Sequence, residues 1–432
     1  MKIAVIGSGI GGLTSAYLLS KAHDVEVFEA NDYIGGHTAT VDVDGLAIDT
    51  GFIVFNDRTY PRFRHLMREL GVAWKDTEMS FSVHNPDTGL EYNGHSLATL
   101  FAQKRNLLRP SFYRMLRDIL RFNQAAKNEY EANRDRLDEL DNTTLTEFVD
   151  ALKVGPLFKD NYLYPMCAAI WSATLKEAAH FPLGFFLRFF MHHGLLNVSD
   201  RPQWAVIEGG SRAYVEPMTR TFADKIHLNT AIVKVVRHEN SVELTTAKGE
   251  VKLFDHVVLA CHSDQALAML ADASAQEQAV LGAIGYQANE VVLHNDEALL
   301  PKRKAAWASW NYWLPPTKAG VARDEQLASV TYNMNILQGL DAGKTYCVTL
   351  NNTAQIKPEL ILRSFIYHHP EYSLKSMAAR KQRDTICGHQ RTHFAGAYWY
   401  NGFHEDGVRS AFDVAARFNL APHVAELERS HG

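Results

Sequence analysis

The sequence predicts an α/β protein built on a Rossmann-like domain, and three features near its start carry that prediction. A short apolar run, Ile3–Ile6, leads directly into the glycine-rich loop Gly7–Gly12, and a helical pattern over Leu13–Leu19 follows. A second apolar run, Val25–Phe28, then ends at Glu29. Strand, glycine loop, helix and strand in this order are typical of the first unit of a parallel, dinucleotide-binding sheet.

The glycine loop has small residues where a phosphate-binding turn needs them. Gly7 suits the tight turn, Gly9 a close backbone approach to a pyrophosphate, and Gly12 the packing of helix on strand. Gly11 belongs to the same loop, and the helix start offers its free N–H groups to phosphates. Glu29 follows Gly12 by seventeen residues and can accept hydrogen bonds from both ribose hydroxyls of an adenosine, which argues against a 2'-phosphate.

A second glycine pair indicates which dinucleotide the loop holds. Gly35 and Gly36 follow the second strand, and a two-strand pattern then ends near Asp49. This arrangement resembles the extended fingerprint of the glutathione-reductase-like flavoproteins, so FAD is the expected cofactor. The further cofactor-binding positions predicted here are Gly36, His37, Thr38, Gly51 and Phe52.

The carboxyl-terminal part repeats a strand, a glycine and an acidic helix start, in Arg391–Gly396, Asn401–Val408 and the helical run Arg409–Phe418. It resembles the closing motif of flavin amine oxidases and phytoene-desaturase-like enzymes. The resemblance implies that this strand and the helix N-terminus meet the ribityl chain and the pyrimidine edge of the flavin. Gly396, Glu405 and Asp406 are therefore predicted to bind the cofactor.

The middle of the chain resembles the same family's return to the cofactor domain, in Val206–Ser211 and Ile226–Val235, which implies that the backbone at Val233 faces the adenine. A hairpin pattern and the buried strand His256–Ala260 follow. We therefore expect a glutathione-reductase-like FAD-binding domain at 1–60, 200–262 and 383–432, and a discontinuous α+β substrate domain with a helical cap at 61–199 and 263–382.

The chain also departs from the amine oxidase pattern. Amine oxidases carry a glutamate where this chain has Ala397 and Tyr398, so the ribityl contact is expected from Glu405 or Asp406. They also pair two aromatic residues on the amine side of the flavin; Phe403 matches one and the other has no match, which disfavours amine chemistry. No cysteine stands in a context that resembles covalent flavin attachment, so the FAD is expected to be non-covalent.

Four longer strings resemble one bacterial family over nearly the whole chain: Cys261–Leu267, Ala306–Tyr312, Thr331–Gln338 and Phe403–Gly407. This is the NAD/FAD-binding flavoprotein family found beside cyclopropane-fatty-acid synthases, which includes the flavoprotein of furan-fatty-acid synthesis and is similar to a bacterial polyunsaturated fatty-acid isomerase. The resemblance implies a flavin acting on an unsaturated or methylated acyl chain, expected to be phospholipid-bound, with a functional link to a cyclopropane-fatty-acid-synthase-like methyltransferase.

An allylic C–H is a suitable hydride donor because the developing cation is delocalised. Return of the hydride gives isomerisation, whereas loss of the electrons to an acceptor gives desaturation, and the sequence leaves both open. The catalytic candidates are His404, as a base for an allylic proton or as a structural hydrogen-bonding residue, and Tyr398 as a weaker candidate. The rival functions are a flavin amine oxidase and a non-catalytic FAD-bound partner of a lipid-modifying enzyme.

A basic and apolar stretch over Leu97–Phe122 carries six lysine and arginine residues against the single acid Asp118, and Pro110 can open a helix within it. Such a helix can lie on an anionic membrane or serve as a packed cap helix with a solvated face. The aromatic string Phe181–Leu196 has two interpretations as well, the wall of an acyl tunnel or simply core.

Composition excludes other classes of function. A net charge of -5 disfavours a nucleic-acid partner. The four cysteines have neither the spacing of a metal site nor that of a disulfide framework, so no metal is expected. The apolar strand begins at the second residue and leaves no room for an export signal, so a cytoplasmic protein is expected, peripheral on the inner face of the membrane if the basic stretch binds lipid.

Overall fold

The computed structural model describes residues 1–197, 199–315 and 322–420, which divide between two compact units. Unit 1 comprises Met1–Lys75, Val206–Tyr286 and Lys375–Gly432, and unit 2 comprises Asp76–Ala205 and Gln287–Leu374. The domains predicted from the sequence have the same order of segments, but unit 1 also takes in 61–75, 263–286 and 375–382, and 200–205 belongs to unit 2. Residues 198, 316–321 and 421–432, which the predicted domains include, lie outside the described residues.

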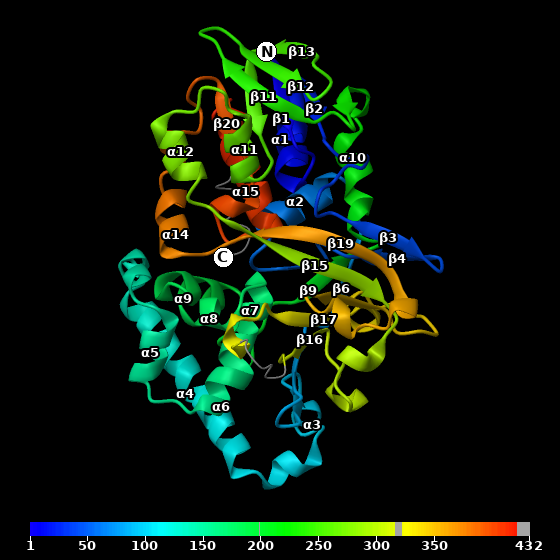
Figure 1. Ribbon diagram of the computed structural model, residues 1–432, viewed down its shortest axis with the longest axis vertical. Coiled ribbons are helices and arrows are strands. Elements are labelled where there is room, and N and C mark those ends of the chain that lie inside the picture. The colour runs from blue at the N-terminus through cyan, green and yellow to red at the C-terminus, as the bar shows by residue number, and fades with distance from the viewer. Residues whose placement is uncertain (198, 316–321, 421–432) are drawn as a thin grey trace. The chain divides into compact units, whose positions relative to one another are not determined.

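The centre of unit 1 is a five-stranded parallel sheet, which confirms the predicted Rossmann-like α/β fold (Figure 1). Its strand order is β10 (Ile226–His227), β2 (Asp24–Phe28), β1 (Lys2–Ile6), β14 (His256–Leu259) and β20 (Thr392–Phe394). Strands β1 and β14 are apolar over most of their length, as expected for the centre of a parallel sheet that is buried on both faces. Ala4, Val5 and Val258 are accordingly inaccessible to solvent.

Two helices meet at the carboxyl edge of this sheet, α1 (Ile10–Ser20) and α15 (His404–Ala416). A β-carbon at Gly11 would stand 3.4 Å from the backbone nitrogen of Gly396 and 3.5 Å from the carbonyl oxygen of Gly407. A β-carbon at Gly407 would lie 2.6 Å from the Ile10 side chain, so α1 and α15 approach this closely because Gly407 has no side chain. Helix α15 begins five residues before the predicted run from Arg409, because Asp406 accepts a hydrogen bond from the Phe403 N–H (2.9 Å) and caps it.

The remaining elements of unit 1 surround this core. Its antiparallel strands are β3 (Thr40–Val43) paired with β4 (Leu46–Asp49), and β11 (Ile232–Arg237), β12 (Val242–Thr246) and β13 (Val251–Phe254) in one small sheet. The strand β5 (Val54–Asn56) and the helices α2 (Pro61–Glu69), α10 (Val215–Thr219), α11 (Ser263–Met269), α12 (Ala275–Leu281) and α14 (Leu374–Arg380) complete the set. The chain passes between the units at four points, within β6 (Trp74–Thr77), β9 (Trp204–Ile207), β15 (Tyr286–His294) and the start of α14.

Unit 2 contains a seven-stranded mixed sheet, in which β16 pairs with β7 in parallel and β7 with β8 antiparallel. The order is β19 (Ile361–Pro370), β15 (Tyr286–His294), β18 (Cys347–Leu350), β17 (Ser329–Asn333), β16 (Trp310–Trp313), β7 (Phe81–Asn85) and β8 (Leu90–Asn93). Its helices are α3 (Leu97–Leu100), α4 (Pro110–Ala132), α5 (Leu145–Ala151), α6 (Pro156–Phe158), α7 (Tyr164–Trp171), α8 (Leu175–Ala179), α9 (Leu183–His192) and α13 (Met334–Leu337).

The two apolar stretches singled out in the sequence both lie in unit 2. Helix α9 buries its phenylalanines against one another and against Trp171, with ring centroids 5.1 Å apart for Trp171–Phe185 and 4.6 Å for Trp171–Phe189. These rings therefore form part of a packed core. The basic stretch is not one helix, since α3 and a 3-10 turn at Lys104–Leu108 precede α4, which begins at Pro110.

Two features are absent from the described residues. Among them, no helix is both long and apolar enough to cross a bilayer. Nor do they contain any cluster of three or more histidine, cysteine, aspartate or glutamate side chains that could hold a metal ion.

Candidate active site

The glycine loop of unit 1 has the geometry of a phosphate-binding turn. Gly7 has a φ of +99°, and its N–H donates to the carbonyl of Phe28 (2.8 Å), which fixes the loop to the end of β2. A β-carbon at Gly12 would lie 1.9 Å from the Gly7 carbonyl oxygen, so only glycine fits there. At Gly9, by contrast, no described heavy atom lies within 4 Å of such a carbon. This open side of the loop fits the close approach of a pyrophosphate.

Glu29 lies directly beneath this loop and is almost fully buried. One carboxylate oxygen accepts hydrogen bonds from the Ser8 N–H (2.9 Å) and the Ser8 hydroxyl (2.6 Å). The other accepts from the backbone and the side-chain amide of Asn31 (2.9 Å each). The carboxylate thus ties the loop to the end of β2, and its contact with a ribose stays a prediction.

The second glycine pair is folded back onto the first loop. A β-carbon at Gly36, which has a φ of +58°, would stand 3.1 Å from the Cα of Gly9. Gly51 is held close to the same turn, because the Phe52 N–H donates to the His37 carbonyl (2.8 Å) and a β-carbon at Gly51 would lie 2.2 Å from that oxygen. The predicted positions from Gly36 to Phe52 therefore gather around the phosphate-binding loop.

His404, the first residue of α15, joins this group through a buried hydrogen-bond network. Its Nε2 lies 2.7 Å from the Tyr214 hydroxyl and 3.3 Å from the Thr38 hydroxyl, and Thr38 and Tyr214 are hydrogen-bonded to each other. The imidazole stacks on Phe52, with centroids 3.6 Å apart and planes inclined by 5°. Burial, and then the nearby His37, lower the pKa of His404 well below its ordinary value, so the ring is neutral near pH 7.

Sequence reasoning missed two members of this site, Tyr214 and Asp49. Asp49 accepts hydrogen bonds from the hydroxyls of Thr40 (2.6 Å) and Ser211 (2.9 Å) and from the Ser211 N–H (2.8 Å), and burial raises its pKa to about 6. The sequence offered one signal for this part of the site, the Gly209–Ser211 string. Gly210 has a φ of +86°, which lets this segment reach Thr40 and Asp49.

The two acids predicted to contact the ribityl chain already have backbone partners. The carboxylate of Glu405 accepts from the Arg62 N–H (3.1 Å) and the Phe63 N–H (2.8 Å) at the start of α2. Asp406 caps its own helix through Phe403. Burial raises the pKa of both Glu405 and Asp406 to about 7. Their present hydrogen bonds attach α15 to its neighbours, and their contact with a flavin stays a prediction.

Val233 and Tyr398 differ in their exposure to solvent, since Val233 is half exposed and Tyr398 is buried. The pairing of β11 with β12 passes from Ile232–Thr246 to Lys234–Thr245, so Val233 is the extra residue of a bulge and is half exposed. A bulged residue is left out of the ladder, which fits the predicted contact of its backbone with an adenine. Tyr398 is buried against Gly396, and its hydroxyl has no hydrogen-bond partner among the described residues.

Comparison with known proteins identifies related sequences. Residues 10–318 match the sequence family described as flavin containing amine oxidoreductase. Over 92 residues the chain is 38% identical to a 1-hydroxycarotenoid 3,4-desaturase of Flavobacterium sp. (strain P99-3), and over 91 residues it is 36% identical to the 15-cis-phytoene desaturase of Capsicum annuum. These stretches cover 21% and 20% of this chain but only 18% and 16% of the two desaturases.

Solved structures resemble the chain over nearly its whole length. A CLA-producing fatty acid isomerase from P. acnes matches with a TM-score of 0.68 and 16% identity, covering 96% of this chain and 98% of the isomerase. A putrescine oxidase bound to putrescine also matches with a TM-score of 0.68, at 15% identity over 97% of this chain and 99% of the oxidase. At such low identity these likenesses establish a shared fold.

The loop glycines give a matched pair of substitutions. Gly9→Ala is expected to fold normally, because its φ of -65° suits alanine and its β-carbon meets no described atom, but to lose most of its FAD since the methyl group faces the expected pyrophosphate. Gly12→Ala forces a methyl group onto the Gly7 carbonyl and should cost about 3 kcal/mol of stability. Urea unfolding and the visible absorption of the purified proteins measure the two effects; a Gly9→Ala protein with full flavin content contradicts the assigned phosphate position.

The raised pKa of Glu405 predicts a pH-dependent stability. The folded protein keeps a proton up to about pH 7, whereas the unfolded chain releases it near its ordinary pKa of 4.5, so the stabilisation present at low pH is lost as the pH rises through 7. Between about pH 5 and about pH 8 the unfolding free energy of the wild type should therefore fall by roughly 3 kcal/mol more than that of Glu405→Gln. Urea titrations test this, with the exposed Glu208→Gln as control; parallel curves for wild type and Glu405→Gln refute it.

Proposed function

The chain belongs to the family of flavin-containing amine oxidoreductases and binds FAD, and from this premise we propose that it moves hydride at an allylic position of an unsaturated or methylated fatty acyl chain. It would act as a desaturase or an isomerase. FAD supplies the hydride acceptor when bound. The residues of this chain hold the cofactor and place a neutral imidazole at the start of α15.

The observation that carries the proposal is the character of the side chains around His404. Thr38, Tyr214 and Phe52 contact it, Phe63 meets it edge to face (5.7 Å), and the imidazole is itself neutral. Movement of a hydride from an allylic carbon develops only a delocalised charge, so it needs no strongly ionised acid or base. An apolar, neutral environment of this kind suits a hydrocarbon chain.

The names of the related proteins point to the same class of substrate. The two curated relatives are named as carotenoid and phytoene desaturases, and one structural neighbour is named as a fatty acid isomerase. The four strings that resemble the flavoprotein family beside cyclopropane-fatty-acid synthases support a narrower proposal. In it the acyl chain is part of a phospholipid, and the reaction belongs to the synthesis of furan or methylated fatty acids together with a methyltransferase.

Amine oxidation is the second candidate, because the matching family is described by that activity and putrescine oxidase shares the fold. A polyamine would carry positive charge into the site, and the described side chains that contact His404 offer no carboxylate to pair with it. Hydrogen peroxide released with polyamines, but not with lipids, would favour this candidate over the first.

An anaerobic spectrum of the FAD-loaded protein tests the proposed reaction. On mixing with phospholipids that bear unsaturated or methylated chains, we expect either stable bleaching of the flavin band, which means dehydrogenation, or a rearranged acyl product without net bleaching, which means isomerisation. Phospholipids with saturated, unbranched chains are the control because they have no allylic hydrogen. A flavin that no acyl lipid reduces, with no product formed, contradicts the proposal and favours a non-catalytic role.

His404 is the candidate proton acceptor if the reaction includes loss of an allylic proton. Its neutral ring meets that requirement, and His404→Gln should then slow acyl-dependent flavin reduction by about a hundredfold or more. Tyr214→Phe is the matched control, since it removes a hydrogen bond of the same network (2.7 Å) but keeps the imidazole. Equal rates for wild type and His404→Gln would leave His404 a structural role only.

A further inference from the structure

The strongest unexplained feature of unit 2 is an exposed apolar tip flanked by arginines. Leu107 and Leu108, at the end of the 3-10 turn before α4, are 48% and 87% exposed. Tyr113 and Leu120, on α4 itself, are exposed as well. Single exposed apolar residues are common on protein surfaces, but neighbouring leucines and a tyrosine in one place form a patch that calls for a partner.

The solvent-facing side of α4 adds positive charge to this tip. Positions 110, 113, 114, 117 and 121 follow helical spacing, so Tyr113, Arg114 and Arg117 lie on one side of the helix. The opposite side buries Phe112 and Met115. Leu107, Leu108 and Pro110 line one hollow of about 450 Å³ together with Tyr113, Arg114 and Arg117.

The charge of this surface is one-sided. Exposed side chains of the stretch include those of Lys104, Arg105, Arg114, Arg117 and Arg121. Its single acid, Asp118, is buried and accepts hydrogen bonds from the Gly155 N–H (2.9 Å) and from Arg121 (3.3 Å). Asp87, in the β7–β8 turn whose Gly89 carbonyl accepts a hydrogen bond from Arg105, and Glu131, near the far end of α4, are exposed carboxylates. The surface therefore favours an anionic partner, although the whole chain has a net charge of -5.

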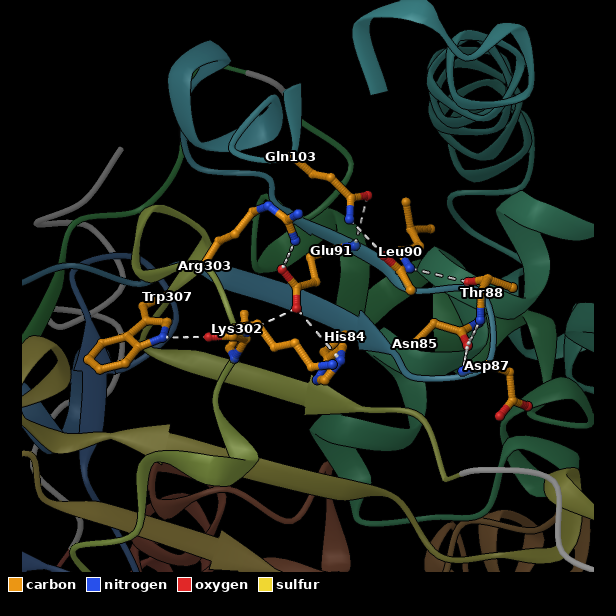
Figure 2. Close-up of polar contacts among 12 residues, drawn as sticks. His84, Asn85, Asp87, Thr88, Leu90, Glu91, Gln103, Lys302, Arg303 and Trp307 are labelled. Carbon is orange, nitrogen blue, oxygen red and sulfur yellow. Dashed lines mark hydrogen bonds and ion pairs between the residues drawn. The ribbon is translucent and has the colours of Figure 1, made fainter. Parts of the chain in front are cut away.

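Polar side chains attach the segment before the tip to the edge of the sheet. Figure 2 shows the hydrogen bonds of Gln103 and Glu91. Edge strand β8 has backbone groups that no further strand can pair. The buried side chain of Gln103 donates to the Gly89 carbonyl (2.7 Å), and that of Asn106 donates to the Glu91 carbonyl (3.3 Å). These side-chain amides supply the hydrogen bonds that a neighbouring strand would make to β8. They attach the segment that carries Leu107 and Leu108 to the edge of the sheet.

The strand beneath is itself anchored by the buried carboxylate of Glu91 (Figure 2). It accepts hydrogen bonds from the Lys302 N–H (2.9 Å) and from the Arg303 guanidinium (2.8 Å). On the other side, the Tyr113 hydroxyl donates to the Leu107 carbonyl (3.0 Å) and ties α4 to the tip. Leu107 and Leu108 are thus exposed although the segment that carries them is attached to the sheet and to α4 by hydrogen bonds.

We propose that this surface, Leu107–Leu108 together with the exposed side of α4, docks the protein on the anionic face of a lipid bilayer. The leucines and Tyr113 enter the boundary between headgroups and acyl chains, and Arg114 and Arg117 contact lipid phosphates. A nucleic acid would use the arginines but not the leucines, whereas a bilayer uses both. The docking is independent of which substrate the flavin oxidises.

Vesicle flotation with the full-length, FAD-loaded protein tests this docking. We expect binding to vesicles of phosphatidylcholine with phosphatidylglycerol, weak binding to phosphatidylcholine alone, and loss of binding as salt is raised. The double variants Leu107→Ser/Leu108→Ser and Arg114→Glu/Arg117→Glu should each lower the partition coefficient by about tenfold or more. Both alter exposed side chains, and unchanged flavin absorption and unfolding midpoints verify that the variants fold.

Matched controls come from β19 in the same unit, where Ile366 is exposed and the exposed Arg363 donates a hydrogen bond to the Leu362 carbonyl (2.8 Å). Ile366→Ser and Arg363→Glu should bind vesicles like the wild type. Three results would overturn the docking surface: no vesicle binding by the wild type, equal loss in the β19 controls, or full binding by both double variants. Tight binding to duplex DNA that survives Leu107→Ser/Leu108→Ser would also overturn it, in favour of a nucleic-acid surface.

Discussion

The close contact between glycines at the carboxyl edge of the parallel sheet is the constraint on which the cofactor site depends. Gly407 in the first turn of α15 has no room for a side chain, because a β-carbon there would lie 2.6 Å from the Ile10 side chain of α1, and Gly11 faces both Gly407 and Gly396 after β20. Two helix N-termini therefore converge on one place, each with free N–H groups and a positive dipole end. Segments nearly four hundred residues apart in the chain are joined there.

From this contact the rest of the site follows by hydrogen bonding. Gly36 brings the second glycine pair onto the first loop, and His404 at the start of α15 reaches Thr38 and Tyr214. Burial keeps the imidazole neutral and holds Glu405 and Asp406 near the point of protonation at pH 7. The imidazole is therefore uncharged and the two carboxyls are about half protonated at pH 7, which agrees with hydride chemistry that needs no strongly ionised acid or base.

Unit 2 shows a different use of polar side chains. Gln103 and Asn106 end the seven-stranded sheet by satisfying the backbone of β8, and the same segment presents Leu107 and Leu108 to solvent. Hydrogen bonds offset the free-energy cost of burying these two amides. The same bonds fix the backbone of the segment that carries the exposed leucines. A rigid apolar tip among arginines loses little conformational entropy when it enters a lipid surface.

The sequence by itself determined the local features of the cofactor domain. The order of strand, glycine loop, helix and strand depends on neighbours in the chain, so the parallel sheet, its glycines and a bound dinucleotide could be predicted from pattern alone, whereas FAD as that dinucleotide rested on the resemblance to known flavoproteins. Only the tertiary structure decided which residues far apart in the sequence contact one another in the site. Tyr214 and Asp49 gain their roles from residues far away in sequence, and Glu405 turns its carboxylate to the N-terminus of α2.

The apolar pattern of the basic stretch shows the same limit. Leu108, Phe112, Met115 and Leu120 recur at helical spacing, yet the fold buries Phe112 and Met115 and exposes Leu108 and Leu120. Spacing defines which residues share a side of a helix, but the neighbouring elements decide which side is covered. Burial is a property of the packed chain, and for that reason the core of unit 2 and its exposed tip became distinguishable only in three dimensions.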